Sequence, residues 1–282
     1  MTNPEPESGA GPALQSNIMA GKRGLIMGVA NKNSIAWGIA QTLREHGAEL
    51  AFTYQGEALG KRVQPLAEQA GSDIILNCDV EDDASVDAVF AELEKRWGKL
   101  DFIVHAIAYS DKEELKGRYV DTTRANFLRS MDVSCYSFTS IASRAAPLMK
   151  DGGALITLSF SGAYRVMPNY NVMGVAKAAL EASVRYLAAD LGRDNIRVNA
   201  ISAGPMRTLA GAAIGGARYI LNFCQDNAPL ERNLALEDIG GAALYLLSDL
   251  SASVTGEIHH VDSGYNIMGM PDPRDTSPES ED

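Results

Sequence analysis

Short apolar runs alternate with longer amphipathic stretches along most of this chain. The amphipathic stretches repeat apolar residues at helical spacing over Ile35–Glu45, Ala84–Trp97, Thr123–Met149, Val172–Leu191 and Leu236–Leu247. The apolar runs between them have the length of buried strands and cover Gly24–Gly28, Glu49–Tyr54, Asp73–Cys78, Leu100–Ala106, Ala154–Ser159, Ile196–Ser202 and Glu257–Val261. Buried strands that alternate with helices are typical of a parallel sheet with crossover connections.

The pattern therefore predicts an α/β fold made of one doubly wound Rossmann-type domain. We expect a seven-stranded parallel sheet with helices on both faces. No break in composition marks a second domain, so the domain is predicted to span residues 18–270. Residues 1–17 and the acidic segment 271–282 are expected to be disordered tails, because they are rich in Pro, Glu, Ser and Asp and poor in apolar residues.

The charge and the cysteines narrow the classes of protein that fit. The formal net charge is −11, and the acidic tails hold more than half of it, so nothing resembles the basic surface of a nucleic-acid-binding protein. The three cysteines are far apart and are expected to be buried, reduced side chains. The four scattered histidines predict no metal site. With no signal peptide and no apolar run long enough to cross a membrane, the chain is predicted to be cytoplasmic.

One connection departs from the short loops of the pattern. Between a strand and the next helix, Ala203 to Pro229 carries Gly204, Pro205, Gly211, Gly215 and Gly216. A long Gly-rich connection in a compact domain is usually a binding loop or a lid, so we expect this segment to cover a ligand site.

Tyr170 and Lys177 form the most informative pair of residues. They are seven positions apart, almost two helical turns, so on one helix both side chains would point to the same side. A phenol and an ammonium that face one pocket suit proton donation to a developing oxyanion. The phenol would give the hydrogen bond, and the cation would hold a cofactor and lower the phenol pKa.

The end of the first strand indicates a dinucleotide site, although the usual GxGxxG motif is absent. Gly28 begins the turn after the strand, and Ser34 is predicted to cap the following helix, whose N-terminus would face a pyrophosphate. Gly38 is expected to let that helix pack closely on the sheet.

Other strand ends add to this interpretation, because ligands of open α/β sheets bind at the carboxyl ends of the strands. Gln55 ends the second strand, where it can bind the adenosine ribose without repelling a 2′-phosphate, so NADH is favoured and NADPH is not excluded. Asp79 follows the third strand, where its carboxylate can accept a hydrogen bond from the adenine. The small residues Ala106 and Ala108 follow the fourth strand, and Gly204–Thr208 follows the sixth, near the expected nicotinamide.

Taken together, these residues resemble the bacterial enoyl-[acyl-carrier-protein] reductases, a divergent branch of the short-chain dehydrogenase/reductase superfamily. The likeness covers residues 18–268, and its specific marker is the Tyr-x6-Lys spacing, where ordinary short-chain dehydrogenases have Tyr-x3-Lys. The resemblance implies reduction of the trans-2 double bond of enoyl thioesters by NADH in fatty acid synthesis. It also implies an acyl carrier protein as partner and a homotetramer that packs through Thr123–Met149 and Val172–Leu191.

The resemblance also implies roles for single residues. Tyr170 would donate to the thioester carbonyl and Lys177 would hold the nicotinamide ribose. The substrate would lie near Ser110, Phe160, Met173 and Met206. Besides Lys177, the residues expected to line the NADH site are Gly28, Ser34, Ile35, Gln55, Asp79, Val80, Ala106, Ile107, Ala108, Gly204, Pro205, Met206, Arg207, Thr208, Leu209 and Ala210.

Two positions depart from the family pattern. Phe160 stands where the family commonly has a second tyrosine, so Tyr170 is predicted to be the only phenol available to the substrate oxygen. The stretch that would dock the acidic carrier keeps a single base, Arg218. Three alternatives stay open: a specialised second reductase, a short-chain reductase of 3-oxoacyl thioesters or other ketones, and a nucleotide-binding protein without activity.

Overall fold

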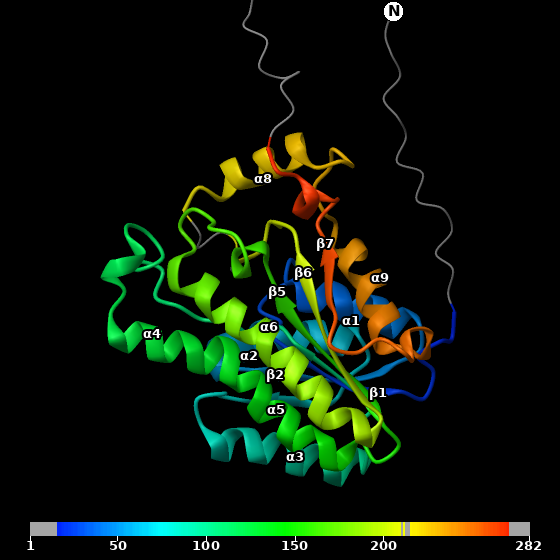
Figure 1. The fold of residues 1–282 in the computed structure, drawn as a ribbon. Helices are drawn as coiled ribbons and strands as arrows, with labels where there is room; N and C mark the ends of the chain where they lie inside the picture. The colour runs from blue at the N-terminus through cyan, green and yellow to red at the C-terminus, as the bar shows by residue number, and fades with distance from the viewer. Residues whose placement is uncertain (1–15, 210, 212–214, 271–282) are drawn as a thin grey trace, which may run out of the picture.

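Seven parallel strands form one sheet at the centre of the molecule, in the order β3-β2-β1-β4-β5-β6-β7 (Figure 1). The computed structural model describes residues 16–209, 211 and 215–270 of the 282. The strands are β1 (Arg23–Met27), β2 (Glu49–Tyr54), β3 (Ile75–Asn77), β4 (Phe102–His105), β5 (Gly153–Ser159), β6 (Ile196–Ala203) and β7 (Ile258–Val261). The predicted doubly wound sheet is confirmed, with strand bounds close to those of the apolar runs.

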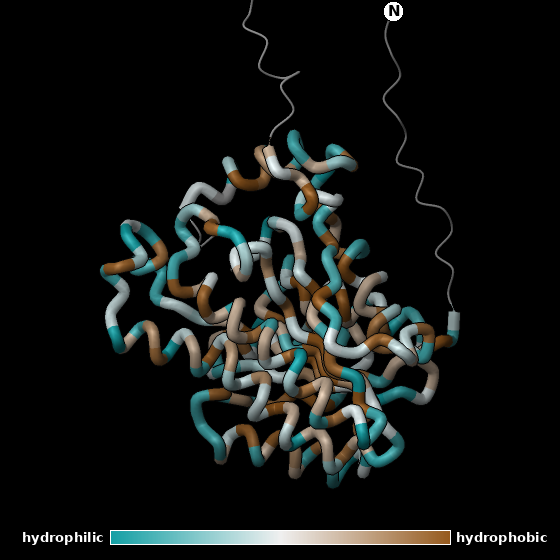
Figure 2. Tube along the Cα trace, in the orientation of Figure 1, coloured by the Kyte–Doolittle hydropathy of each residue, from teal (hydrophilic) through white to brown (hydrophobic). Residues whose placement is uncertain are grey.

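Helices cover both faces of the sheet. The described α-helices are α1 (Ile35–Glu45), α2 (Gly56–Gln69), α3 (Asp83–Trp97), α4 (Arg124–Met131), α5 (Ser137–Ala145), α6 (Asn171–Leu191), α8 (Ala217–Asn227) and α9 (Leu236–Leu247). Side chains of α3, α5 and α6 pack on one face of the sheet, and those of α1, α2 and α9 pack on the other. Figure 2 shows the hydrophobic strands that run between these two layers.

Two glycines bring α1 and α9 unusually close together. A Cβ on Gly38 of α1 would lie 2.6 Å from the Cβ of Leu236, and a Cβ on Gly240 of α9 would lie 2.1 Å from Oγ1 of Thr42. Gly38 therefore allows a helix to approach another helix, and the prediction that it serves packing on the sheet was wrong. The contact fixes the position of α1, whose N-terminus faces the cavity described below.

The long helix predicted over Thr123–Met149 is divided. Thr123 caps it as a hydroxyl that accepts from the Asn126 amide, but α4 ends at Met131 and a π-helical turn follows over Asp132–Tyr136 before α5 begins. Within that turn Ser134 accepts from the Tyr109 amide and donates to the Tyr109 carbonyl, both at 2.9 Å. The turn thus holds the loop that follows β4.

The connection Ala203–Pro229 is less open than the glycines suggested, because it contains α8. This helix lies beyond the carboxyl ends of β5 and β6 (Figure 1). Residues 210 and 212–214 of the connection lie outside the described residues, as do the predicted tails apart from Ser16 and Asn17. Among the described helices, none is long and apolar enough to cross a membrane.

Candidate active site

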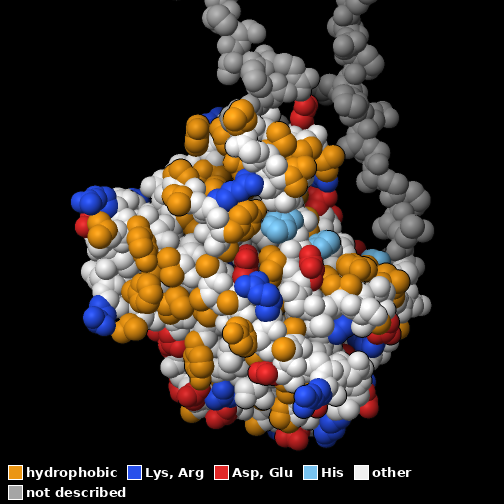
Figure 3. All heavy atoms as spheres, in the orientation of Figure 1, with side chains coloured by type: hydrophobic (Ala, Val, Ile, Leu, Met, Phe, Trp, Pro, Cys, Tyr) orange, Lys and Arg blue, Asp and Glu red, His pale blue; other side chains and the backbone are white. Residues whose placement is uncertain are grey.

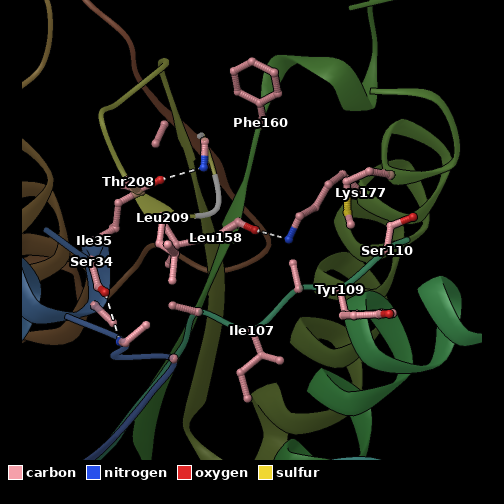
Figure 4. Close-up of a pocket in the computed structure, with 18 of the residues that line it drawn as sticks. Ser34, Ile35, Ile107, Tyr109, Ser110, Leu158, Phe160, Lys177, Thr208 and Leu209 are labelled. Atoms are coloured by element: carbon pink, nitrogen blue, oxygen red, sulfur yellow. Dashed lines mark hydrogen bonds between the residues drawn. The ribbon is translucent and has the colours of Figure 1, made fainter. Parts of the chain in front are cut away.

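A cavity of about 610 Å³ opens along the carboxyl ends of the strands. It runs from residues that follow β2 and β3, such as Gln55 and Val80, past the N-terminus of α1 to Tyr170 and Lys177 beside β5 and β6. Figure 4 shows Ser34 and Ile35 on one side of this cavity and Lys177 and Ser110 on the other. Its volume lies in the usual range for small-molecule and cofactor sites.

Most of the predicted site residues line this one cavity. Both proposed catalytic residues and all of the proposed substrate residues are among them. The predicted residues that line the cavity are Gly28, Ser34, Ile35, Gln55, Val80, Ala106, Ile107, Ala108, Ser110, Phe160, Tyr170, Met173, Lys177, Gly204, Pro205, Met206, Thr208 and Leu209.

Two predicted cofactor residues, Asp79 and Arg207, are not part of this lining. The Asp79 carboxylate accepts from the Glu81 amide within its own turn, at 3.0 Å. Arg207 is exposed and borders a separate, smaller hollow beside Asn33 and Leu236. Ala210 lies outside the described residues.

The first amides of α1 are free for a ligand, because Ser34 does not cap the helix as predicted. Ser34 occupies the N-cap position, but its hydroxyl does not cap the helix. Instead Oγ accepts from the amides of Ala30 and Asn31, at 3.0 and 3.1 Å, and so folds the turn after β1. The first amides of a helix have no intrahelical partner and favour an anion, so this end of α1 suits a pyrophosphate.

Tyr170 and Lys177 face the same cavity from different kinds of structure. Lys177 is inside α6, whereas Tyr170 is the residue just before the helix and is followed by Asn171 at φ +33°. The prediction of two side chains on one helix face was therefore wrong in its geometry. The loop before α6, and not the helical repeat alone, directs the phenol into the cavity.

Lys177 is a buried ammonium with a single protein partner among the described residues. Its Nζ donates to the Leu158 carbonyl at the end of β5, at 2.7 Å (Figure 4). Burial lowers the pKa of Lys177 to about 8, while Glu181 and Cys135 act in the opposite direction. An ammonium has three donors, so two remain for ligand hydroxyls.

Tyr170 is a buried phenol whose ring packs against Phe160. The two rings meet edge to face, with centroids 5.1 Å apart. Burial raises the pKa of Tyr170 above its usual value, with a smaller contribution from Glu181 in the same direction. The expected lowering of the phenol pKa by Lys177 was wrong for this structure, and Tyr170 stays a protonated hydrogen-bond donor at neutral pH.

Known proteins match both the sequence and this geometry. The family model for Enoyl-(Acyl carrier protein) reductase matches residues 28–266. This chain belongs to the enoyl-(acyl carrier protein) reductase family. Among curated relatives, the "Enoyl-[acyl-carrier-protein] reductase [NADH] 2" of Rhizobium meliloti is 69% identical, with 91% of this chain and 96% of that protein covered. The NADH reductase FabI of Escherichia coli is 51% identical over 90% of this chain and 97% of its own.

Solved structures agree with the family assignment of this reductase. FabI from Candidatus Liberibacter asiaticus has a TM-score of 0.90 at 60% identity, with 91% of this chain and all of that chain covered. The enzyme from Anaplasma phagocytophilum, solved in complex with NAD, has a TM-score of 0.89 at 60% identity, with 91% of this chain and 98% of that chain covered.

The reductase cavity also has lining residues that the sequence reasoning missed. Tyr54 and Tyr109 both line it. That Tyr170 is the only phenol available to the substrate oxygen stays a prediction. The others of note are Cys78, Glu81, Leu115, Arg129, Val133, Met167, Ile220 and Leu221. Ile220 and Leu221 belong to α8, within the Ala203–Pro229 connection that was expected to cover a ligand site. Most of the others come from turns, from α4 and from the π-helical turn, where no local motif indicates a site. For Arg129, the sequence shows only a basic residue in a predicted helix, which does not indicate a ligand site.

A buried histidine supports the reductase cavity from below. His105 ends β4 and is fully buried. Its Nδ1 lies 3.0 Å from Oγ1 of Thr157 on β5, and its Nε2 lies 2.9 Å from Oγ of Ser137 on α5. Burial, and the nearby Lys177 charge, lower the pKa of His105 to about 3. A neutral imidazole thus ties β4, β5 and α5 together beneath the site.

Proposed function

We propose that this chain reduces the trans-2 double bond of enoyl thioesters carried by an acyl carrier protein, with NADH as the hydride donor. The observation that supports this most is the presence of Tyr170 and Lys177 in one cavity of a family member. The relatives at 69% and 51% identity are both named as NADH-dependent enoyl-[acyl-carrier-protein] reductases. We further propose that the reaction takes place in the cytoplasm.

The residues present fit a nicotinamide dinucleotide. The free amides at the start of α1 suit its pyrophosphate, Gln55 at the end of β2 suits the adenosine ribose, and the unused donors of Lys177 suit the nicotinamide ribose. Gln55 carries no negative charge, so it does not itself exclude a 2′-phosphate. When bound, the cofactor supplies a hydride for the β-carbon of the substrate.

The protein's part in the reaction is to orient the substrate and to stabilise charge on its oxygen. As the β-carbon is reduced, negative charge develops on the thioester oxygen, and Tyr170 donates a hydrogen bond to it. The raised pKa of Tyr170 keeps this donor protonated, and the buried Lys177 charge favours the anionic state nearby. Phe160, Met173 and Met206 offer apolar surface for the acyl group and help to exclude water.

The choice of thioester tests the proposed reaction. Purified protein is given NADH with either crotonyl thioester or acetoacetyl thioester, and the loss of NADH absorbance is followed. The enoyl substrate should be reduced and the ketone should not. The opposite result would identify a ketone reductase and overturn the proposal.

A Tyr170→Phe variant separates an enzyme from a nucleotide-binding protein without activity. NADH binding should persist, because the phenol serves the substrate, whereas turnover should fall by about 10²–10⁴-fold, as is typical for loss of a positioned acid. The control is Tyr54→Phe, which removes a phenol from the β2 end of the same cavity. Equal turnover of wild type and Tyr170→Phe would exclude the proposed role of this phenol.

We propose that the carrier docks beside α8, where Arg218 is exposed. An acidic carrier is attracted by a base at the cavity mouth, and a single base gives weak steering. Arg218→Ala should raise KM for the carrier-bound substrate and leave KM for a free pantetheine thioester unchanged. Equal KM values for the carrier-bound substrate in both proteins would place the docking surface elsewhere.

A further inference from the structure

Arg129, Glu81 and Tyr109 form a cluster that the proposed chemistry does not use. The guanidinium of Arg129 donates twice to the Glu81 carboxylate, from Nε at 2.9 Å and from the second terminal nitrogen at 2.8 Å. Its Cζ also lies 4.2 Å from the centre of the Tyr109 ring. Such a fork and such a ring contact fix an arginine side chain in one orientation.

The three residues come from separate segments that meet at the cavity. Glu81 belongs to the turn after β3, Tyr109 to the loop after β4, and Arg129 to α4, and all three line the cavity. The backbone of Tyr109 is itself held by Ser134 of the π-helical turn. Through Arg129 the cluster links the turn after β3 to the loop after β4 at the rim of the cavity, although the Arg129 and Glu81 side chains stay partly exposed.

The position of the cluster along the edge of the sheet indicates which part of a ligand it would contact. Tyr170 and Lys177 line the cavity beside β5, where Lys177 Nζ donates to the carbonyl of Leu158, the next-to-last residue of that strand. Glu81 follows β3, which is four strands away from β5 in the sheet order. With the reacting nicotinamide at Tyr170, the adenosine half of the dinucleotide lies toward β2 and β3. Val80 and Val133 offer apolar surface there for a flat base.

We propose that Arg129, held by Glu81 and Tyr109, is a positioning residue that closes the cavity wall over the adenosine half of NADH. This inference rests on the proposed function, because it takes NADH as the ligand of the cavity. Within the cluster, Glu81 neutralises the arginine, so the wall acts through its shape and its contact with the base more than through free positive charge. Whether removal of the Glu81 charge weakens or strengthens ligand binding distinguishes a fixed wall from a free cation.

The test compares Arg129→Gln and Glu81→Gln with wild type by calorimetric titration. Both variants should weaken the binding of NADH and of ADP-ribose by about tenfold, since either change releases the arginine from its fixed position. Binding of reduced nicotinamide mononucleotide, which lacks the adenosine half, should be unaltered. Arg129→Lys should also weaken NADH binding, because an ammonium cannot form the fork.

Arg144 provides the matched control. It pairs with Asp83 and Asp87 between α5 and α3, as Arg129 does with Glu81, but it does not line the cavity. Arg144→Gln should leave the Kd for ADP-ribose within about twofold of wild type. Thermal unfolding of every variant, followed by circular dichroism, checks that the fold is intact.

Two results would overturn the inference. Unchanged ADP-ribose binding in Arg129→Gln would show that the cluster is a surface ion pair only. Tighter binding in Glu81→Gln would show that a free cation, and not a fixed wall, attracts the ligand. Wild-type protein that binds no NADH would instead contradict the proposed function, so the two failures can be told apart.

Discussion

At the scale of single residues, some side chains of the cavity could be predicted from the local sequence and others could not. Tyr170, Lys177 and Gln55 were predicted because each lies at a strand end or at a telling spacing. Arg129 and Glu81 were missed because they are 48 positions apart and meet only after α4 crosses toward the β3 turn. The direction of the Tyr170 pKa shift was also beyond the sequence, since it depends on how completely the fold buries the ring.

The lowered pKa of Lys177 predicts a loss of activity in mild alkali. Its folded-state pKa of about 8 lies below the ordinary 10.5, so the buried amine loses its charge as pH rises through 8. The ratio kcat/KM for NADH, which reports the free enzyme, should therefore fall above about pH 8. A Lys177→Met variant should have a low ratio without this alkaline limb.

The lowered pKa of Lys177 has the opposite effect on stability, which should rise with pH where activity falls. Between pH 8 and 10.5 the unfolded chain binds more protons at this site than the folded chain, so the Lys177 contribution to the free energy of unfolding rises with pH. An alkaline loss of activity without unfolding would thus identify the lysine charge as its cause. Parallel loss of activity and of circular dichroism signal would contradict this interpretation.

At the scale of elements, the strands were easier to predict than the helices. The strands β1, β2, β4, β5 and β6 are runs of mostly buried residues, a simple pattern to recognise, whereas the edge strands β3 and β7 are only partly buried. The pattern did not pick out α2, which contains Pro65 and buries only Val63 and Ala67. It joined α4 and α5 into one helix, because an extra residue in a π-helical turn leaves no mark in apolar spacing.

His105 predicts acid sensitivity at the junction of β4, β5 and α5. Its folded-state pKa of about 3 lies below the ordinary 6.5, so the unfolded chain takes up a proton first as pH falls. Stability should therefore be lost between pH 6.5 and 3, by on the order of 5 kcal/mol from this residue. Urea unfolding at several pH values measures this slope.

A His105→Asn variant serves as the comparison for that slope. It should be less stable than wild type at neutral pH, because Thr157 and Ser137 lose a well-placed partner. Its stability should then depend less on pH over the acid range. The same acid slope in wild type and variant would assign the sensitivity to other groups.

At the scale of the whole molecule, apolar side chains remain exposed on the helices α4, α5 and α6. Leu128 and Tyr186 are 59% and 76% exposed, and Tyr136 lies between α4 and α5 with 56% of its surface exposed. Figure 3 shows hydrophobic side chains gathered over the region of α4 and α6. Large exposed apolar patches commonly mark interfaces, which agrees with the homotetramer proposed from the family resemblance.

A charge in that surface should therefore separate the subunits. Tyr186→Glu is expected to lower the molar mass found by light scattering, because an interface core excludes an unpaired carboxylate. Gln64→Glu, which adds a carboxylate to an exposed position of α2, should leave the mass unchanged. A wild-type protein of monomeric mass would contradict the proposed assembly.

The junction before α6 has a consequence for how such a reductase can change. Tyr170 precedes the helix and Lys177 lies within it, so the group proposed to contact the substrate and the group proposed to hold the cofactor belong to separate structural elements. Substitutions between Phe160 and Tyr170 can re-aim the phenol while α6 stays in place. Selection, or an engineer, can in this way alter the range of acyl groups accepted without rebuilding the recognition of NADH.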